Sequence, residues 1–138
     1  MKKTSIALVL LLAVLLVAGI ACSSLSINNV SVDWEYEGTK YYLSSVTFEL
    51  ENAGFSRVYY NSVKIYANDE LVGSEDVLLS SVFDPGNTHT FEFIRCTTDL
   101  ECLHEYSAYS QELVELKIII SDDSDTITTY TDTIKPTQ

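Results

Sequence analysis

Strict alternation of apolar and polar side chains is the feature that most narrows the folds open to this chain. In Val30–Glu37, valine, tryptophan and tyrosine occupy every second position, and acidic or hydroxyl side chains fill the positions between them. Tyr41–Glu51 repeats the pattern through Val46, Phe48 and Leu50. Leu113–Ser121 repeats it with apolar side chains at 114, 116, 118 and 120. A period of two residues is typical of β-strands that bury one face. The alternation therefore predicts three half-buried strands.

Further strands and the turns between them complete the prediction. Apolar and β-branched residues predict four more strands, over Val58–Ala67, Glu70–Val77, Thr88–Arg95 and Thr126–Ile134. Turn-forming residues separate the runs, at 52–54 (Asn-Ala-Gly), 68–69 (Asn-Asp), 84–86 (Asp-Pro-Gly) and 122–125 (acidic). About seven short strands without a long helix predict an all-β chain folded as an antiparallel β-sandwich.

Residues Cys96–Glu112 interrupt the strand pattern. A Thr-x-x-Glu sequence at 98–101 has the spacing of a helix capping box, and Leu103 and Tyr106 follow at a helical interval. We therefore expect one short surface helix in this insertion. Tyr106 and Tyr109 are the expected contacts with a partner, because tyrosine is enriched at protein interfaces. A packed crossover without a binding role is the alternative.

Residues 1–21 have the features of an export signal. Lys2 and Lys3 precede the apolar run Ile6–Ile20, and small residues, Gly19 and Ala21, stand three and one positions before a cleavage site. We expect a signal helix that is removed by cleavage after Ala21. The run is shorter than the roughly 20 apolar residues of a spanning helix, although an uncleaved N-terminal anchor is the alternative.

The next residue, Cys22, adds a second expectation. Gly19-Ile20-Ala21-Cys22 resembles the lipobox of prokaryotic lipoproteins, although Gly19 and Ile20 depart from its usual aliphatic and small residues. The alternative is ordinary signal-peptidase cleavage that leaves a free or pairing thiol. The chain has three cysteines, and lipid on Cys22 with a disulfide between Cys96 and Cys102 accounts for all three.

These observations predict an exported protein held on the cell membrane. Its mature form begins at a lipidated Cys22 outside the cytoplasm, with residues 22–29 as lipid anchor and tether and residues 30–135 as the sandwich domain. The 117 residues that remain after cleavage suffice for one domain.

Charge and chemistry exclude several function classes. The net charge is −12, and loss of Lys2 and Lys3 with the signal leaves six basic against 20 acidic residues, a charge of −14. Such acidity argues against a nucleic-acid partner. We expect no enzyme, cofactor or metal site, because His89 and His104 are the only histidines and have no metal-ligand spacing. Weak calcium binding at Asp122–Asp125 is a minor alternative to a plain acidic turn.

Four sequence blocks resemble the strand blocks of CARDB-type domains, a group of immunoglobulin-like extracellular modules. They are VTFELENAG (Val46–Gly54), VKIYANDELVGSE (Val63–Glu75), DPGNTHTFEF (Asp84–Phe93) and LKIIISDDSDTI (Leu116–Ile127). The blocks are also similar to water-stress type late-embryogenesis-abundant domains. The resemblance covers residues 30–134 and implies an immunoglobulin-like sandwich of seven strands that binds or spaces other molecules, with no catalytic residues.

The expected function is therefore a membrane-anchored, non-enzymatic binding module that contacts a protein or glycan of the cell envelope. The alternative is a structural spacer or stress-related envelope protein without a specific ligand. A hydrolase that uses His104 is the least favoured hypothesis, because no nucleophile motif accompanies this histidine.

Overall fold

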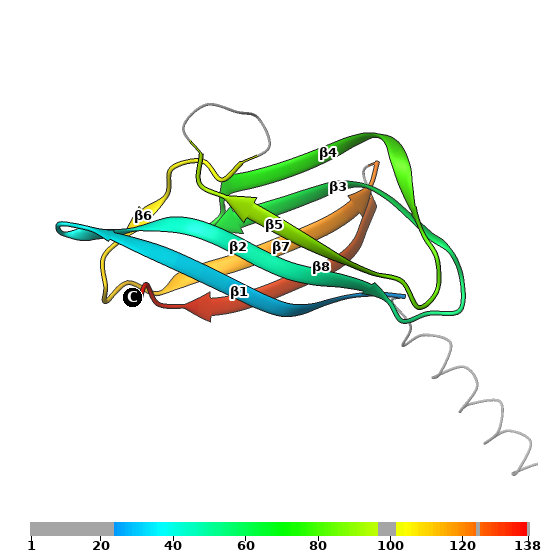
Figure 1. Ribbon diagram of the computed structural model, residues 1–138, viewed down its shortest axis with the longest axis horizontal. Helices are drawn as coiled ribbons and strands as arrows, with labels where there is room; N and C mark the ends of the chain where they lie inside the picture. The colour runs from blue at the N-terminus through cyan, green and yellow to red at the C-terminus, as the bar shows by residue number, and fades with distance from the viewer. Residues whose placement is uncertain (1–23, 97–101, 124, 138) are drawn as a thin grey trace, which may run out of the picture.

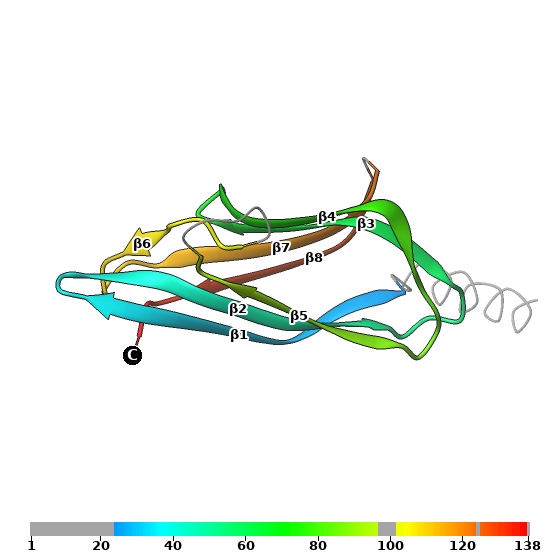
Figure 2. The same cartoon turned by 45° about the horizontal axis from the view of Figure 1, so that its top comes forward.

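The computed structural model describes residues 24–96, 102–123 and 125–137, which form two antiparallel β-sheets (Figure 1). The strands are β1 (Leu25–Glu37), β2 (Lys40–Asn52), β3 (Val58–Ala67), β4 (Glu70–Phe83), β5 (Thr88–Ile94), β6 (Ser107–Ala108), β7 (Val114–Asp122) and β8 (Asp125–Ile134). One sheet has the order β1-β2-β5, with β6 also paired to β2, and the other has the order β4-β3-β7-β8. Figure 2 shows the sheets as two layers. The predicted all-β, two-layer architecture is confirmed.

Side chains from the inner faces of both sheets form one core. Its fully buried members include Val46, Phe48 and Leu50 of β2, Val63 and Ile65 of β3, and Leu116, Ile118 and Ile120 of β7. Each such side chain contributes about 1.5–3 kcal/mol when it leaves water. The rings of Phe48 and Phe91 stack at 5.1 Å within one sheet, and Tyr60 of the other sheet meets Phe91 edge-on at 6.3 Å. Aromatic contacts therefore join the two layers.

The first strand is longer than the sequence pattern predicts. β1 begins at Leu25, so residues 25–29 belong to a strand and not to a tether. Leu25 is completely buried and pairs with Asn52. The register shifts between Asn28 and Ser31, and Asn29 has a φ of 51°. This β-bulge moves the inward phase from odd to even positions, which conceals the alternation before Val30.

The predicted turn positions hold in the structure. Asn68 and Asp69 have φ values of 48° and 64° and form the two-residue connection of the β3–β4 hairpin. At the turn after β4, Gly86 has a φ of 80°, and the N–H of Asn87 donates to the carbonyl oxygen of Asp84 at 3.1 Å.

The predicted surface helix of the insertion is wrong. Residues 102–112 contain no helix and include the short strand β6 instead. The backbone of this segment bonds to three other strands: Leu103 N–H to Ile94 O (3.1 Å), His104 N–H to Val72 O (2.7 Å) and Leu43 N–H to Tyr106 O (3.0 Å). A short helix is marginal by itself, so these tertiary bonds and the burial of Leu103 outweigh the helical spacing. The Thr-x-x-Glu sequence at 98–101 lies outside the described residues.

The expected signal helix at 1–21, like Cys22, lies outside the described residues. Within the described part of the chain, no helix is long and apolar enough to cross a membrane.

The disulfide predicted from cysteine counting is present. Cys96 and Cys102 are bonded, with Cα atoms 5.6 Å apart. The bond follows β5 directly and stands beside the backbone bridge between Arg95 and Leu103. It therefore fixes the start of the insertion to the end of a core strand.

Removal of this disulfide should destabilise the domain by about 2 kcal/mol, because the closed loop is short and the chain-entropy gain is modest. Urea unfolding of the Cys96→Ser/Cys102→Ser variant against the parent tests this value. A loss below about 0.5 kcal/mol would show that the bridge between Arg95 and Leu103 holds the insertion without the disulfide.

A buried asparagine connects the two sheets at one end of the sandwich. The side-chain Nδ2 of Asn52 donates to the carbonyl oxygens of Phe83 (2.8 Å) and Ser56 (2.9 Å), and its Oδ1 accepts from the N–H of Gly54 (3.1 Å). Its backbone N–H and C=O bond to the turn at 84–87, at 3.0 and 2.8 Å. All polar groups of this fully buried residue are thus paired.

Asn52→Asp should lower the free energy of unfolding by about 3 kcal/mol or more. The substitution keeps the size of the side chain but places a carboxyl oxygen against two carbonyl oxygens, so buried acceptors lose their donor. Urea unfolding measures the change, with exposed Asn87→Asp as the control for added charge. Equal stability of the two variants would contradict the assigned amide orientation.

Candidate functional site

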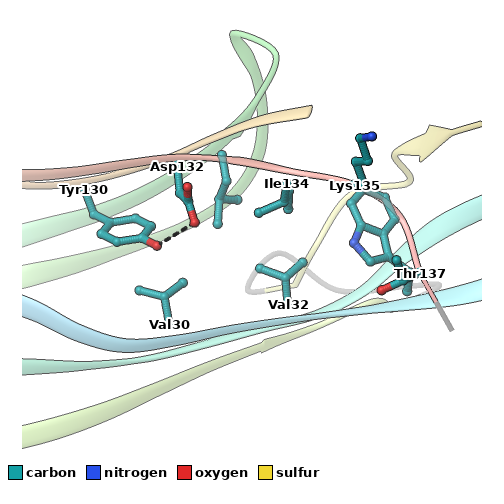
Figure 3. A pocket seen from close by; sticks show the side chains of 9 residues that line it. Val30, Val32, Tyr130, Asp132, Ile134, Lys135 and Thr137 are labelled. Carbon is teal, nitrogen blue, oxygen red and sulfur yellow. Dashed lines mark hydrogen bonds between the residues drawn. The ribbon is translucent and has the colours of Figure 1, made fainter. Parts of the chain in front are cut away.

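A groove of about 270 Å³ opens between β1 and β8 (Figure 3). Its lining combines apolar, aromatic and charged side chains: Val30, Val32, Trp34, Leu116, Tyr130, Asp132, Ile134, Lys135 and Thr137. Val30 and Val32 point into it from β1, and Tyr130, Asp132 and Ile134 face them from β8 (Figure 3).

The groove follows from the sheet order. β1 and β8 each lie at one edge of their sheet, and each bonds to a neighbour on one side only, β2 and β7 respectively. The inward-phase valines of β1 are only partly buried, whereas Leu116 of the inner strand β7 is 1% exposed. An apolar strip therefore remains accessible where the layers meet.

Polar groups on β8 give one wall of the groove a fixed hydrogen-bond pattern. The hydroxyl of Tyr130 donates to Oδ2 of Asp132 at 3.2 Å, and Oδ1 of Asp132 accepts from the N–H of Thr133 at 2.8 Å. Burial raises the pKa of Tyr130, and the negative charge of Asp132 raises it further. Tyr130 thus stays protonated at neutral pH, and the wall offers a carboxylate beside a neutral phenol.

Trp34 connects the groove to the insertion. Its ring lies 6.3 Å from the ring of Tyr106 in a tilted arrangement. The hydroxyl of Tyr106 accepts a hydrogen bond from Nδ2 of Asn68 at 3.0 Å, so this side chain spans from β1 of one sheet to the β3–β4 turn of the other. Burial raises the pKa of Tyr106. Of the two expected partner contacts, Tyr106 therefore closes one end of the sandwich.

Tyr109, the other expected contact, is open to solvent. Its side chain is 54% exposed, and Nζ of Lys40 lies 5.2 Å from the ring centroid. Leu103, six residues earlier in the insertion, is buried instead. Of the two tyrosines that the structure describes in the insertion, Tyr109 is thus the one that faces outward.

The remaining residues singled out from the sequence are dispersed. His89 and His104 are both exposed, and the His89 ring lies edge-on to Phe91 at 4.6 Å. In the acidic turn, Asp123 exchanges two hydrogen bonds with the side chain of Asn61, both 2.9 Å long. Within residues 24–96, 102–123 and 125–137, no three His, Cys, Asp or Glu side chains are grouped as metal ligands.

Sequence reasoning missed a charged cluster on the β1–β2 hairpin. Nη1 of Arg95 lies 2.7 Å from Glu37 and 3.7 Å from Glu35, and its guanidinium is 4.6 Å from the centroid of the Tyr42 ring. The hydrogen bond to Glu37 raises the pKa of Arg95. The cluster joins the end of β5 to the hairpin, next to the insertion.

Tyr106 and Tyr109 should respond differently to truncation. Tyr106→Ala removes a half-buried ring and a hydrogen bond between the sheets, so we expect a loss of about 2 kcal/mol, whereas Tyr109→Ala should change stability by less than about 0.5 kcal/mol. Chemical unfolding of both variants tests this contrast. Similar losses in both would mean that Tyr109 also has a structural role.

Comparison with known proteins assigns no family to the chain. No protein-family model and no curated protein matches it. A solved structure of a protein from Archaeoglobus fulgidus aligns with 82% of this chain and 98% of its own, at 11% identity and a TM-score of 0.39. Similarity at this level identifies neither a family nor a function.

Proposed function

We propose that this chain is a membrane-anchored extracytoplasmic lipoprotein whose mature part is a non-enzymatic, immunoglobulin-like binding module for a protein or glycan of the cell envelope. The observation that carries the binding role is the groove between β1 and β8, which continues through Trp34 to the insertion. Concave, mostly apolar surfaces with a few fixed polar groups are the usual form of ligand sites.

An extended ligand suits this groove. β8 bonds to β7 on one side only, so its other edge is available to a peptide strand, which would place alternate side chains against Val30 and Val32. A glycan would instead stack a sugar face on Trp34 and bond its hydroxyl groups to Asp132 or Lys135. Both ligand classes would occupy the same groove.

The strand arrangement supports the immunoglobulin-like part of the proposal. Seven long strands divide into three and four, and the pairs β2–β5 and β3–β7 join strands that are not consecutive in the chain. Immunoglobulin-like sandwiches have Greek-key connections of this kind. CARDB-type membership, suggested by four strand blocks, remains the family that we propose, although a fold of this class names no ligand.

The anchor is proposed from the N-terminal sequence. Cys22 stands two residues before Ser24, where the described chain begins at one end of the sandwich (Figure 1). Lipidation through a thioether-linked diacylglycerol would add two acyl chains, and at about 0.8 kcal/mol per buried methylene these suffice for stable anchoring.

A structural spacer is the second candidate, and the shape of the molecule favours it. The 13 residues of β1 run nearly the full length of the sandwich (Figure 2), which corresponds to roughly 43 Å at about 3.3 Å per residue. An elongated domain of this kind would hold an attached element away from the membrane without any ligand.

Cys22→Ser should release the protein from membranes. In detergent phase partitioning, the parent should enter the detergent phase and the variant the aqueous phase, because the acyl chains are lost. The Cys96→Ser/Cys102→Ser variant, which keeps Cys22, is the control and should stay with the detergent. A parent protein in the detergent phase with the mass of residues 1–138 would show an uncleaved anchor instead of lipid.

Val32→Glu should weaken binding to isolated envelope fragments more than tenfold, because it places a charge in the apolar strip. Leu71→Glu, at a 41% exposed position outside the groove, is the matched control and should bind like the parent. Protease treatment of the fragments should abolish binding to a protein partner, and glycosidase treatment binding to a glycan. Absence of saturable binding by the parent would favour the spacer.

A further inference from the structure

Phe55 is the most exposed large apolar side chain in the described part of the chain. It is 99% exposed in the loop at 53–57, which joins β2 to β3. This loop lies at the end of the sandwich where the described chain begins, opposite the β1–β2 hairpin (Figure 1). Folding of the domain does not bury this phenylalanine, so its exposure points to a contact with a surface outside the domain.

The loop is held firmly against the first described residue. The N–H of Ala53 donates to the carbonyl oxygen of Ser24 at 2.9 Å. A Cβ atom on Gly54 would lie 2.6 Å from Cβ of Ser24, so only glycine allows this approach. Both Gly54 and Ser56 also bond to the buried side chain of Asn52. The aromatic ring therefore projects from a fixed base beside Ser24.

The chain before Ser24 determines which surface the ring meets. Two residues extend at most about 7 Å, so a lipidated Cys22 would bring the bilayer surface close to this loop. An uncleaved apolar run at Ile6–Ile20 would place the bilayer at the same end. We infer that the loop at 53–57 is a membrane-contacting surface, with Phe55 inserted at the boundary between lipid headgroups and acyl chains. This inference rests on the membrane anchoring proposed above.

Neighbouring side chains suit an interfacial position. Tyr59 and Val82 form a cross-strand pair near the loop, and each is 48% exposed. Nε of Arg57, two residues after Phe55, lies 2.7 Å from Oδ1 of Asp84, so the charge of this arginine is compensated. Aromatic and aliphatic side chains without an uncompensated charge beside them suit a surface that enters the headgroup region.

Charge limits the kind of lipid surface. The acidic β7–β8 turn lies at the same end of the sandwich (Figure 1), and the mature chain carries a charge of −14. An anionic bilayer would repel this end, whereas a zwitterionic surface would not. Phosphatidylcholine vesicles are therefore the appropriate probe.

The test measures tryptophan depth in the processed, membrane-extracted protein reconstituted into phosphatidylcholine vesicles. The probe variant combines Trp34→Phe with Phe55→Trp, and the control combines Trp34→Phe with Tyr109→Trp, which places the single tryptophan at the opposite end. Brominated phosphatidylcholine should reduce the emission of the probe variant about twofold or more and leave the control unchanged. Phe55 and Tyr109 are both exposed, and Trp34→Phe keeps an aromatic ring beside Tyr106, so both variants should fold.

Three outcomes would overturn the inference, and they are distinguishable. If both variants float with the vesicles and neither is quenched, the domain is anchored but the loop does not touch lipid. If the parent protein does not float with the vesicles, the proposed anchoring fails, and the membrane role of Phe55 fails with it. Quenching of both variants alike would place the whole domain against the bilayer and contradict the specific role of this loop.

Discussion

The buried amide of Asn52 is the interaction on which the arrangement of the two sheets depends. It lies at the end of β2, in one sheet, and its Nδ2 donates to Phe83 at the end of β4, in the other. Because a buried amide is costly unless every donor and acceptor is paired, its hydrogen bonds hold the loop at 53–57 and the turn at 84–87 in place. One residue thus fixes the end of the sandwich at which the chain enters it.

The opposite end is closed by aromatic packing, and the side between β1 and β8 stays open. Tyr106 joins Trp34 of one sheet to Asn68 of the other. Exposed edge strands invite pairing with other chains unless charge or composition prevents it. Here Asp33, Glu35 and Glu37 are exposed on β1, and β8 is rich in threonine and carries Asp132. Negative charge on both edges disfavours self-association while leaving the apolar strip accessible to a different partner.

The sequence predicted the strands well because one physical rule governs them. A half-buried strand must alternate, and the turns require residues that tolerate positive φ, such as Asn68, Asp69 and Gly86. The bulge at Asn29 was not predicted, because one extra residue reverses which side chains of the strand point inward. The groove was not predicted either, because the inward phase of Val30 and Val32 does not indicate which strand lies at the edge of a sheet. Only the sheet order, set by contacts between distant residues, determines that.

The two ends of the sandwich have different chemistry, which bears on how a ligand would approach. The end at Ser24 carries the exposed ring of Phe55. Trp34 of the groove and Tyr109 of the insertion lie toward the other end, at the β1–β2 hairpin. If a lipid and an inserted phenylalanine both hold the first end, the domain has two contacts with the bilayer and a restricted tilt. The groove then faces sideways and runs away from the membrane. A spacer gains nothing from a fixed tilt, whereas a binding module gains a constant orientation of its groove toward the envelope.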